Sequence, residues 1–392
     1  MKKANVSWQY LTILQKEIRI YFYPLLMMGV LFAFTNSCKE DEIIKKDPVI
    51  TWADPADISL GTLLSATQLN ATADAPGTFV YTPPVGTKLN EGLNQDLKAD
   101  FTPTDAGAYN TLNKTVKINV NNPANPAHLE MVNIPAGTFT MGSPTTEVSR
   151  SDDETQHQVT LSAFRMNKYE ITNAQYAAFL NAKSIGSDGL YAAGLYPLEV
   201  LIYASSGSLD WGLHYTGGKW IPVAGNENHP VINVTWFGAS QFAAYAGGTL
   251  PTEAQWEYAC RGNTKSNTDT PFNTGNCLSN AQADYNWAYK YNTCTNTITT
   301  YPGKTQTAGS YVANAYGLYC MHGNVWEWCS DWYGTYPTAA QNNPTGAMSG
   351  SARVLRGGGW SDKAQNCRSA FRNYGSPNSV DDGIGFRVVL VP

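Results

Sequence analysis

The sequence predicts a mixed α+β protein in which a small strand-rich module precedes a larger domain rich in loops. Short runs of alternating apolar residues indicate strands, and three stretches with helical spacing indicate short helices. The 34 glycines and 21 prolines break these runs at short intervals. Only 15% of the 392 residues are charged and 43% are hydrophobic, so the chain can bury a sizeable core.

The first 38 residues have the polarity of an export signal. Basic residues precede an apolar run at 21–34, which is shorter than a membrane span and stops just before Cys38. The segment resembles a bacterial lipoprotein signal in which Cys38 is lipidated, and a plain signal-anchor helix is the alternative. The acidic stretch at 39–42 is similar to tags that export lipoproteins to the cell surface. We therefore expect an exported outer-membrane or cell-surface lipoprotein, held to the membrane by its lipid, with 39–47 as a tether.

Residues 48–120 read as a small β-sandwich. Strand-like runs at 77–83, 96–105 and 114–120 are separated by turn residues at intervals near those of sandwich domains. The stretch resembles a single bacterial immunoglobulin-like repeat. It contains no cysteine or histidine, so we interpret it as a spacer, followed by a Pro/Asn-rich linker at 121–128.

The main domain, 129–392, begins with strands and continues with helices. The stretch 131–143 predicts two strands paired through a glycine turn, and 157–166 predicts another strand. Helices are expected to begin at Thr172, near Thr235 and at Thr252, where Gln255 completes a capping box. Residues 182–230 have the composition of an insertion with turns and exposed aromatic side chains.

Several motifs in this domain carry a family resemblance. The stretch Tyr316 to Trp332 packs three tryptophans and two tyrosines into seventeen residues, and LRGGGWSDKAQNCRSAFR and GIGFRVV follow at 355–372 and 383–389. With IPAGTFTMGS, EITNAQYAAFL and LPTEAQWEYACRG earlier in the chain, they resemble the formylglycine-generating enzymes, also called sulfatase-modifying factors. The resemblance runs from about Met131 to the C-terminus. It implies a C-type-lectin-like α+β fold dominated by irregular structure.

The resemblance also implies a reaction, for which this chain has an incomplete set of residues. The family's enzymes oxidise a substrate cysteine to formylglycine with Cu(I), which two thiolates hold just after a Gly-Gly-Ser turn. Here the turn is 357–359, the residues after it contain no cysteine until Cys367, and Cu(I) favours two sulfur ligands. We therefore expect no copper site. Cys367 and Trp326, which matches the family's tryptophan beside the oxygen site, are the candidate catalytic residues if oxidase chemistry is kept.

A structural calcium ion is a further implication of the resemblance. By position, Gly323 and Val325 would supply carbonyl oxygens and Glu327 a carboxylate. The residue that opens this site is Asp or Asn in the family and is Cys320 here, a poor ligand for a hard cation. A second calcium site of the family maps onto Asp284 and the carbonyl after it. Calcium thus remains an open expectation.

Apart from the lipidation site, six of the seven cysteines remain to be assigned. An even number in an exported chain indicates disulfides, and no pair of CxxC motifs suggests zinc. Cys277 and Cys294 flank one local loop and are expected to bridge. Cys329 with Cys367 is the preferred second pair, and Cys260 with Cys367 is its competitor.

Charge patterning leaves two interpretations of the C-terminal arginines and argues against one class of partner. Arg356, Arg368, Arg372 and Arg387 either line a groove for an anionic ligand or pair with Asp362, Asp381 and Asp382. The net charge is -5 and the 26 basic residues are spread along the chain, so we expect no nucleic-acid partner.

Three functions follow from these observations. The first is a surface-tethered module that binds an unknown protein or glycan, or serves structurally, at the cell envelope without oxidase chemistry. The second is an active enzyme that matures sulfatases through Cys320, Cys329 or Cys367. The third is a glycan-binding protein that uses aromatic residues of the insertion such as Trp211.

Overall fold

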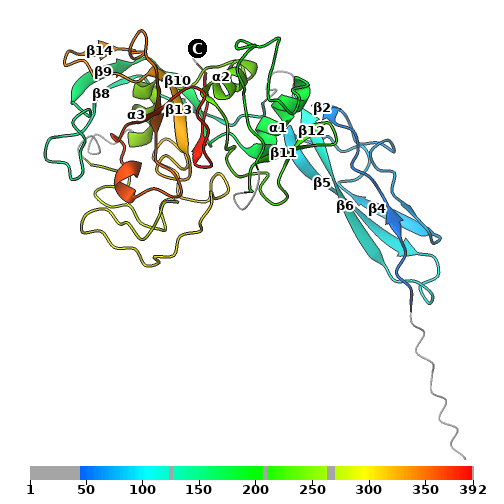
Figure 1. Ribbon diagram of the computed structural model, residues 1–392. Coiled ribbons are helices and arrows are strands. Elements are labelled where there is room, and N and C mark those ends of the chain that lie inside the picture. Colours follow the sequence, from blue (N-terminus) through cyan, green and yellow to red (C-terminus); the bar gives the residue numbers. More distant parts are fainter. Residues whose placement is uncertain (1–44, 123–126, 206–209, 263–269, 391–392) are drawn as a thin grey trace, which may run out of the picture. The chain divides into compact units, whose positions relative to one another are not determined.

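The computed structural model describes residues 45–122, 127–205, 210–262 and 270–390 (Figure 1). The expected signal peptide and Cys38 lie outside these ranges. Within them, no helix combines the length and the apolar character needed to cross a bilayer. The described chain is rich in strands and has few helices, as the sequence predicts.

The N-terminal module consists of strands around a hydrophobic core of its own. A four-stranded sheet has the order β2-β6-β5-β4, and β1 pairs with β3. Alternate residues of β5, such as Leu97, Ala99 and Phe101, point into the core. Its membership of the immunoglobulin-like repeats stays a prediction. The strands are β1 Ile50–Thr51, β2 Ile58–Ser59, β3 Thr72–Ala73, β4 Gly77–Thr82, β5 Gly92–Pro103 and β6 Leu112–Asn121.

The described residues of the main domain form short strands, three α-helices and one 3-10 helix. Its helices are α1 Asn173–Ala182, α2 Trp236–Tyr245, α3 Glu253–Arg261 and the 3-10 helix η1 Ala364–Cys367. Its strands are β7 Met131–Ile134, β8 Gly137–Met141, β9 His157–Leu161, β10 Phe164–Asn167, β11 Leu213–Thr216, β12 Lys219–Pro222, β13 Trp326–Trp332, β14 Gln341–Asn342, β15 Arg353–Arg356, β16 Asn373–Gly375, β17 Ile384–Gly385 and β18 Val389–Leu390.

Threonine caps begin all three α-helices where the sequence predicts them. The side chains of Thr172 and Thr252 accept hydrogen bonds from the backbone N–H groups of Gln175 and Gln255, and both glutamines return the contact. Thr235 accepts from the N–H of Gly238. These caps satisfy backbone donors that the first helical turn leaves without an intrahelical acceptor.

The predicted pairing of the first two strands in this domain is wrong. β7 pairs with β10, and β8 pairs with β9, so the chain passes from one three-stranded sheet to another at Pro135. The stretch 157–166, expected to be one strand, likewise forms two. Ile134 and Phe139 nevertheless enter the same hydrophobic cluster. The apolar pattern identifies strands, while the choice of partner depends on packing between distant segments.

A four-stranded sheet of order β16-β15-β13-β17 lies at the centre of the domain and separates two parts of its core. Successive residues of a strand face opposite sides. Accordingly, Trp328 and Leu355 pack in one large cluster, while Cys329 and Val354 pack in the other. The second half of the aromatic stretch noticed in the sequence, Trp326–Trp332, is therefore a strand with both faces covered.

Buried ion pairs tie this sheet to the rest of the domain. Glu327 on β13 accepts two hydrogen bonds from Arg387, each 2.7 Å long. The other pairs are Arg356 with Glu253 and Glu257, Arg372 with Glu253, Arg261 with Glu257, and Arg368 with Glu147 and Glu154. The expectation that the C-terminal arginines pair with Asp362, Asp381 and Asp382 is thus wrong. These arginines form their ion pairs with glutamates from earlier segments of the chain.

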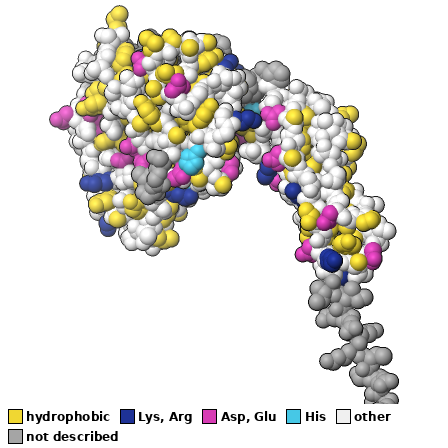
Figure 2. All heavy atoms as spheres, turned by 45° about the vertical axis from the view of Figure 1, so that its right-hand side comes forward, with side chains coloured by type: hydrophobic (Ala, Val, Ile, Leu, Met, Phe, Trp, Pro, Cys, Tyr) yellow, Lys and Arg dark blue, Asp and Glu magenta, His cyan; other side chains and the backbone are white. Residues whose placement is uncertain are grey.

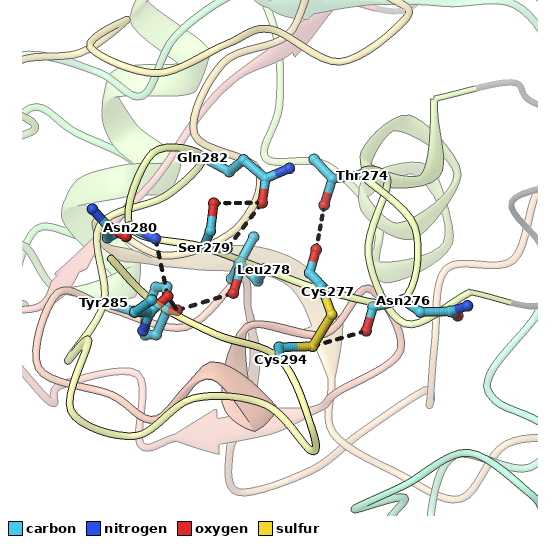
Figure 3. The surroundings of a disulfide bond; sticks show 10 residues. Thr274, Asn276, Cys277, Leu278, Ser279, Asn280, Gln282, Tyr285 and Cys294 are labelled. Carbon is cyan, nitrogen blue, oxygen red and sulfur yellow. Dashed lines mark hydrogen bonds between the residues drawn. A yellow bond between two sulfur atoms is a disulfide. The ribbon is translucent and has the colours of Figure 1, made fainter. Parts of the chain in front are cut away.

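The segment between α3 and β13 is irregular: its described residues contain no helix or strand (Figure 1). The expected disulfide between Cys277 and Cys294 is confirmed and closes a loop within this segment. Figure 3 shows hydrogen bonds around it, including one from the hydroxyl of Tyr285 to the carbonyl of Leu278. The covalent bond and these contacts stand in for the regular backbone ladder that the segment lacks.

We expect the substitution Glu257→Gln to lower the free energy of unfolding by about 3–5 kcal/mol, because it leaves Arg261 and Arg356 buried without one of their anionic partners. Urea unfolding measures the change. The matched control is Glu130→Gln, which breaks an exposed pair with Lys168 and should cost less than about 1 kcal/mol. Equal effects of the two substitutions would contradict the role given to the buried pairs.

Candidate functional site

The triple-glycine bend after β15 has a backbone that excludes side chains. Gly357 and Gly358 have φ angles of 101° and 77°, in the region that favours glycine. A Cβ atom on Gly358 would lie 2.6 Å from the sulfur of Cys367. The bend therefore presses the backbone directly against the 3-10 helix that carries this cysteine.

Cys367 faces the interior and not a cleft. It is fully buried, its sulfur lies 3.8 Å from the carbonyl oxygen of Lys363, and it packs with Phe272 and Leu278. Ala364, in the segment where the resemblance places the family's first active cysteine, is buried beside it. The residues beyond the bend at positions 364 and 367 thus contribute to a hydrophobic cluster.

The predicted bridge between Cys329 and Cys367 is not formed, and neither is its competitor with Cys260. Cys260, Cys320, Cys329 and Cys367 are all free thiols among the described residues. Cys329 belongs to the cluster on one face of β13, whereas Cys367 belongs to a separate small cluster. Cys329 and Cys367 do not bridge because they lie in different parts of the core. The even number of cysteines in the sequence carries no information about these positions.

Burial raises the pKa of each free thiol. The pKa of Cys260 rises to about 12, and those of Cys320, Cys329 and Cys367 lie well above the ordinary value. All four are therefore protonated at neutral pH. Because the thiolate is the form that attacks electrophiles and binds soft metals, these cysteines have the character of core residues.

Cys260 lies next to His322, but the two do not form a catalytic pair. The sulfur is 3.8 Å from Nε2 of the imidazole. Nε2 accepts the backbone N–H of Asn273 at 3.1 Å, and Nδ1 donates to the carbonyl of Cys367 at 2.7 Å. Burial lowers the pKa of His322 to about 4, so the ring is neutral with both nitrogens engaged.

Trp326 is held in place by a carboxylate that the sequence interpretation did not recognise as a site residue. Its indole N–H donates to Asp362 at 2.7 Å. Asp362 also accepts the N–H of Gly359 at 3.0 Å and the side-chain amide of Asn366 at 2.8 Å. Burial raises the pKa of this half-buried carboxyl. The bend, the tryptophan edge and the carboxylate thus form one hydrogen-bonded unit that reaches the surface.

The aromatic residues of the insertion are less exposed than expected. Trp211 is only 5% exposed and meets the ring of Trp360 edge-on at 5.5 Å. The large apolar side chains that the insertion does expose include Leu195, Leu198 and Tyr203. In the face shown in Figure 2, charged side chains are scattered among larger uncharged and apolar areas. A test of glycan binding based on Trp211 would therefore perturb packing.

Glu327, the carboxylate expected to bind calcium, is already fully engaged. One oxygen accepts from Arg387 and from the indole N–H of Trp256, and the other accepts from Arg387. Gly323 donates its N–H to the carbonyl of Gly357, while the side chain of Val325 is buried. In this arrangement Glu327 holds a cationic side chain where the resemblance implies a metal ion.

Asp284 and Glu170, in contrast to Glu327, have carboxylate oxygens that accept no hydrogen bond from the described residues. Within the described part of the chain, both carboxylate oxygens of Asp284 and one of Glu170 are buried without a hydrogen-bond partner. Burial and the charge of Glu170 raise the pKa of Asp284 to about 8, and burial raises that of Glu170 to about 7. The described residues contain no group of three or more His, Cys, Asp or Glu side chains that could hold a metal ion. The two carboxylates suit a hard cation and fit calcium if backbone oxygens complete the set.

Comparison with known proteins gives this architecture a family. The sequence profile of the Sulfatase-modifying factor enzyme 1-like domain matches residues 117–391. The chain belongs to this family. The formylglycine-generating enzyme of Mus musculus is 32% identical over 279 residues, which cover 66% of this chain and 74% of the mouse protein. The enzyme of the same name from Streptomyces coelicolor is 32% identical over 284 residues, covering 65% of this chain and 87% of that protein.

Two further relatives show how widely the sulfatase-modifying-factor domain occurs. A protein named serine/threonine-protein kinase pkn1 from Chlamydia caviae is 34% identical over 266 residues, or 67% of this chain, but this match covers only 38% of that protein. The structure of PvdO from Pseudomonas aeruginosa is similar with a TM-score of 0.51 at 28% identity, covering 67% of this chain and 94% of that one. Proteins with different names thus share this domain.

We expect the substitution Asp284→Asn to change how stability depends on pH when a chelator is present. The folded pKa of about 8 lies above the model-peptide value of 3.8, so between these values the folded protein keeps a proton that the unfolded chain has released. The free energy of unfolding should therefore fall by about 1.4 kcal/mol per pH unit as pH rises through this window. Asparagine has no such proton, so the variant should lose this slope and be more stable at the alkaline end. Urea unfolding across a pH series measures both profiles, and parallel profiles would contradict the assignment.

Proposed function

We propose that this sulfatase-modifying-factor domain is a binding module at the cell envelope and does not oxidise cysteine with copper. The observation that carries the proposal is the position of Cys367. It is the only cysteine after the triple-glycine bend in the sequence, and it faces the interior, where its sulfur contacts the backbone of Gly358 and Lys363. A substrate cysteine has no access to it.

The state of the other thiols supports the same conclusion. Each is buried and protonated, whereas Cu(I) binds thiolates and favours two of them together. Cys260 and Cys367 are near enough for Cys260 to contribute to the raised pKa of Cys367, but no hydrogen bond or disulfide joins two free thiols among the described residues. The residues present therefore do not fit a copper ion, and we derive no reaction step through one.

The surface around the bend supports a role in recognition. Asp362 and Phe371 are partly exposed, and Lys363 is exposed beside them. The carboxylate is fixed by three hydrogen bonds, and the ring of Phe371 lies 6.0 Å from that of Trp326. Rigid aromatic and charged groups of this kind lose little entropy when a partner binds. The partner we propose is a protein or glycan at the cell envelope. A lipid on Cys38 would hold this protein at the membrane, close to such a partner.

An active sulfatase-maturing oxidase is the alternative, and the identity to formylglycine-generating enzymes favours it. To separate the two, the protein is incubated with oxygen, copper and a peptide that contains a sulfatase cysteine motif. We expect no aldehyde product by mass spectrometry, because the second thiolate is missing. The enzyme from Streptomyces coelicolor is the positive control. Aldehyde formation that is lost in Cys367→Ser would sink the proposal.

We also propose that Asp284 and Glu170 hold a structural calcium ion. The support is their unpartnered oxygens and the close approach of the backbone: a Cβ atom on Gly323 would lie 2.0 Å from the carbonyl oxygen of Asp284. Calcium would neutralise the carboxylates and bind the folded state only, so the ion would stabilise the fold by mass action.

Calcium added to chelator-treated protein should therefore raise the free energy of unfolding, by about 2.7 kcal/mol at one hundred times the dissociation constant. Thermal unfolding with and without the ion measures the effect. The variant Asp284→Asn should lose the response, whereas Asp210→Asn, which removes a carboxylate paired with His214 elsewhere, should keep it. A wild-type protein indifferent to calcium would refute this site and leave the binding function untouched.

A further inference from the structure

A cavity at the far end of β13, away from the triple-glycine bend, has the features of a second binding site. It has a volume of about 270 Å³. The end of β13, the start of α3, the ends of β8 and β9, and the loop 334–347 form its walls. At about 30 Å³ for each water molecule, the space would hold roughly nine waters or a ligand of similar size.

Asp331 presents one unpaired carboxylate oxygen to this cavity. The side chain is only 3% exposed. Its Oδ2 accepts the backbone N–H of Glu253 at 3.0 Å and the hydroxyl of Ser330 at 2.9 Å. Its Oδ1 has no hydrogen-bond partner among the residues the structure describes. The carboxylate is thus fixed by one oxygen and offers the other.

The neighbouring arginines compensate the charge of Asp331 only in part. Burial and then the charge of Glu253 raise the pKa of Asp331 to about 7. Arg372, which also lines the cavity, is committed to Glu253 through hydrogen bonds of 2.7 and 2.9 Å. Arg353 stacks on the ring of Trp332 at 3.4 Å and donates to the carbonyl of Ser330. A ligand that brings a positive charge to Oδ1 would therefore add to the partial compensation that Arg372 and Arg353 provide.

His157 supplies a second acceptor to the cavity. Its Nδ1 lies 3.1 Å from the carbonyl oxygen of Thr155, which can only accept, so this nitrogen carries the proton. In the neutral ring Nε2 is then an acceptor, and the described residues provide no donor to it. The ring packs at 4.9 Å on Tyr336, whose hydroxyl donates to Glu253. The hydrogen bond of Nδ1 and the contact with Tyr336 thus fix the orientation of the imidazole and leave Nε2 without a partner among the described residues.

We propose that this cavity binds a primary ammonium group on an unbranched alkyl chain, with Asp331 Oδ1 and His157 Nε2 as its acceptors. An ammonium group has three donors and no acceptor, which complements a site with two free acceptors. Met141, Ala254, Pro337 and Pro344 provide apolar walls for the methylene groups. The rings of Tyr336 and Trp332 line the same space, and aromatic faces attract cations.

Gly346 keeps the space above the carboxylate open. Its φ angle is 78°, and a Cβ atom there would lie 2.8 Å from Oδ1 of Asp331. Any side chain at this position would cover the oxygen that we assign to the ligand. The loop thus passes close to Asp331 without filling the site.

The test is a titration of the full chain with two probes, n-butylammonium and Nα-acetyl-lysine N-methylamide. It is carried out above the Asp331 pKa of about 7, so that the carboxylate is charged. Nα,Nε-diacetyl-lysine N-methylamide has the same chain without the charge and is the neutral control. Calorimetry or NMR measures binding. We expect saturable binding of the charged probes and at least about tenfold weaker binding of the neutral one. Binding of both charged probes indicates a site for free alkylamines, and binding of the lysine derivative alone indicates a lysine side chain of a partner.

The key variant is Asp331→Asn, which keeps an oxygen for the N–H of Glu253 and turns an amide donor toward the cavity. It should weaken binding of the charged probes by at least about tenfold. Asp210→Asn removes an aspartate that contacts His214 outside the cavity and should leave binding unchanged. If Asp331→Asn does not fold, the comparison of charged and neutral probes on the wild type decides alone. Equal binding of those probes, no binding of any, or undiminished binding by a folded Asp331→Asn variant would overturn the proposal.

Discussion

Buried pairs of arginine and glutamate hold together segments that are far apart in this chain. Arg387 near the C-terminus meets Glu327 on β13, and Arg356 and Arg372 meet glutamates at the start of α3. A single buried charge is costly, and so these segments can only be buried together. The part of the main domain that the structure describes has three short α-helices and long irregular loops, so it has few regular hydrogen-bond ladders to align its segments. The ion pairs provide that alignment, and they fix the sheet in which the triple-glycine bend follows the interior strand β15.

The carboxylates of the domain fall into two groups according to their partners. Burial alone would raise the pKa of Glu253, but Arg372 and Arg356 lower it. Asp284 and Asp331 are buried as well, but neighbouring carboxylates add to the effect of burial and the pKa of each is raised. The first group holds the fold together. The second group stores unfavourable electrostatic energy that a proton or a bound cation can relieve, and such groups concentrate at functional sites.

Local signals in the sequence predicted the structure well, whereas choices between distant partners did not follow from them. Thr172, Thr235 and Thr252 were predicted as helix caps because each threonine and the backbone N–H group that it accepts from lie only three positions apart. Cys277 and Cys294 are likewise close in sequence. Whether Cys329 and Cys367 can bridge depends on which part of the core each residue enters. The glutamates that bind the arginines lie up to 221 positions away. For the same reason Glu170 was missed: nothing in EITNAQ indicates that its charge acts on the distant residue Asp284.

The disulfide lies in the same loop as the residue with the least compensated charge. Cys277 and Cys294 are seventeen positions apart, and Asp284 lies between them. The crosslink limits how far this loop can move away from Gly323, against which Asp284 packs. A covalent bond thus shortens the path between the two chain segments that flank this buried carboxylate, in a stretch that has no helix or strand among its described residues to hold them.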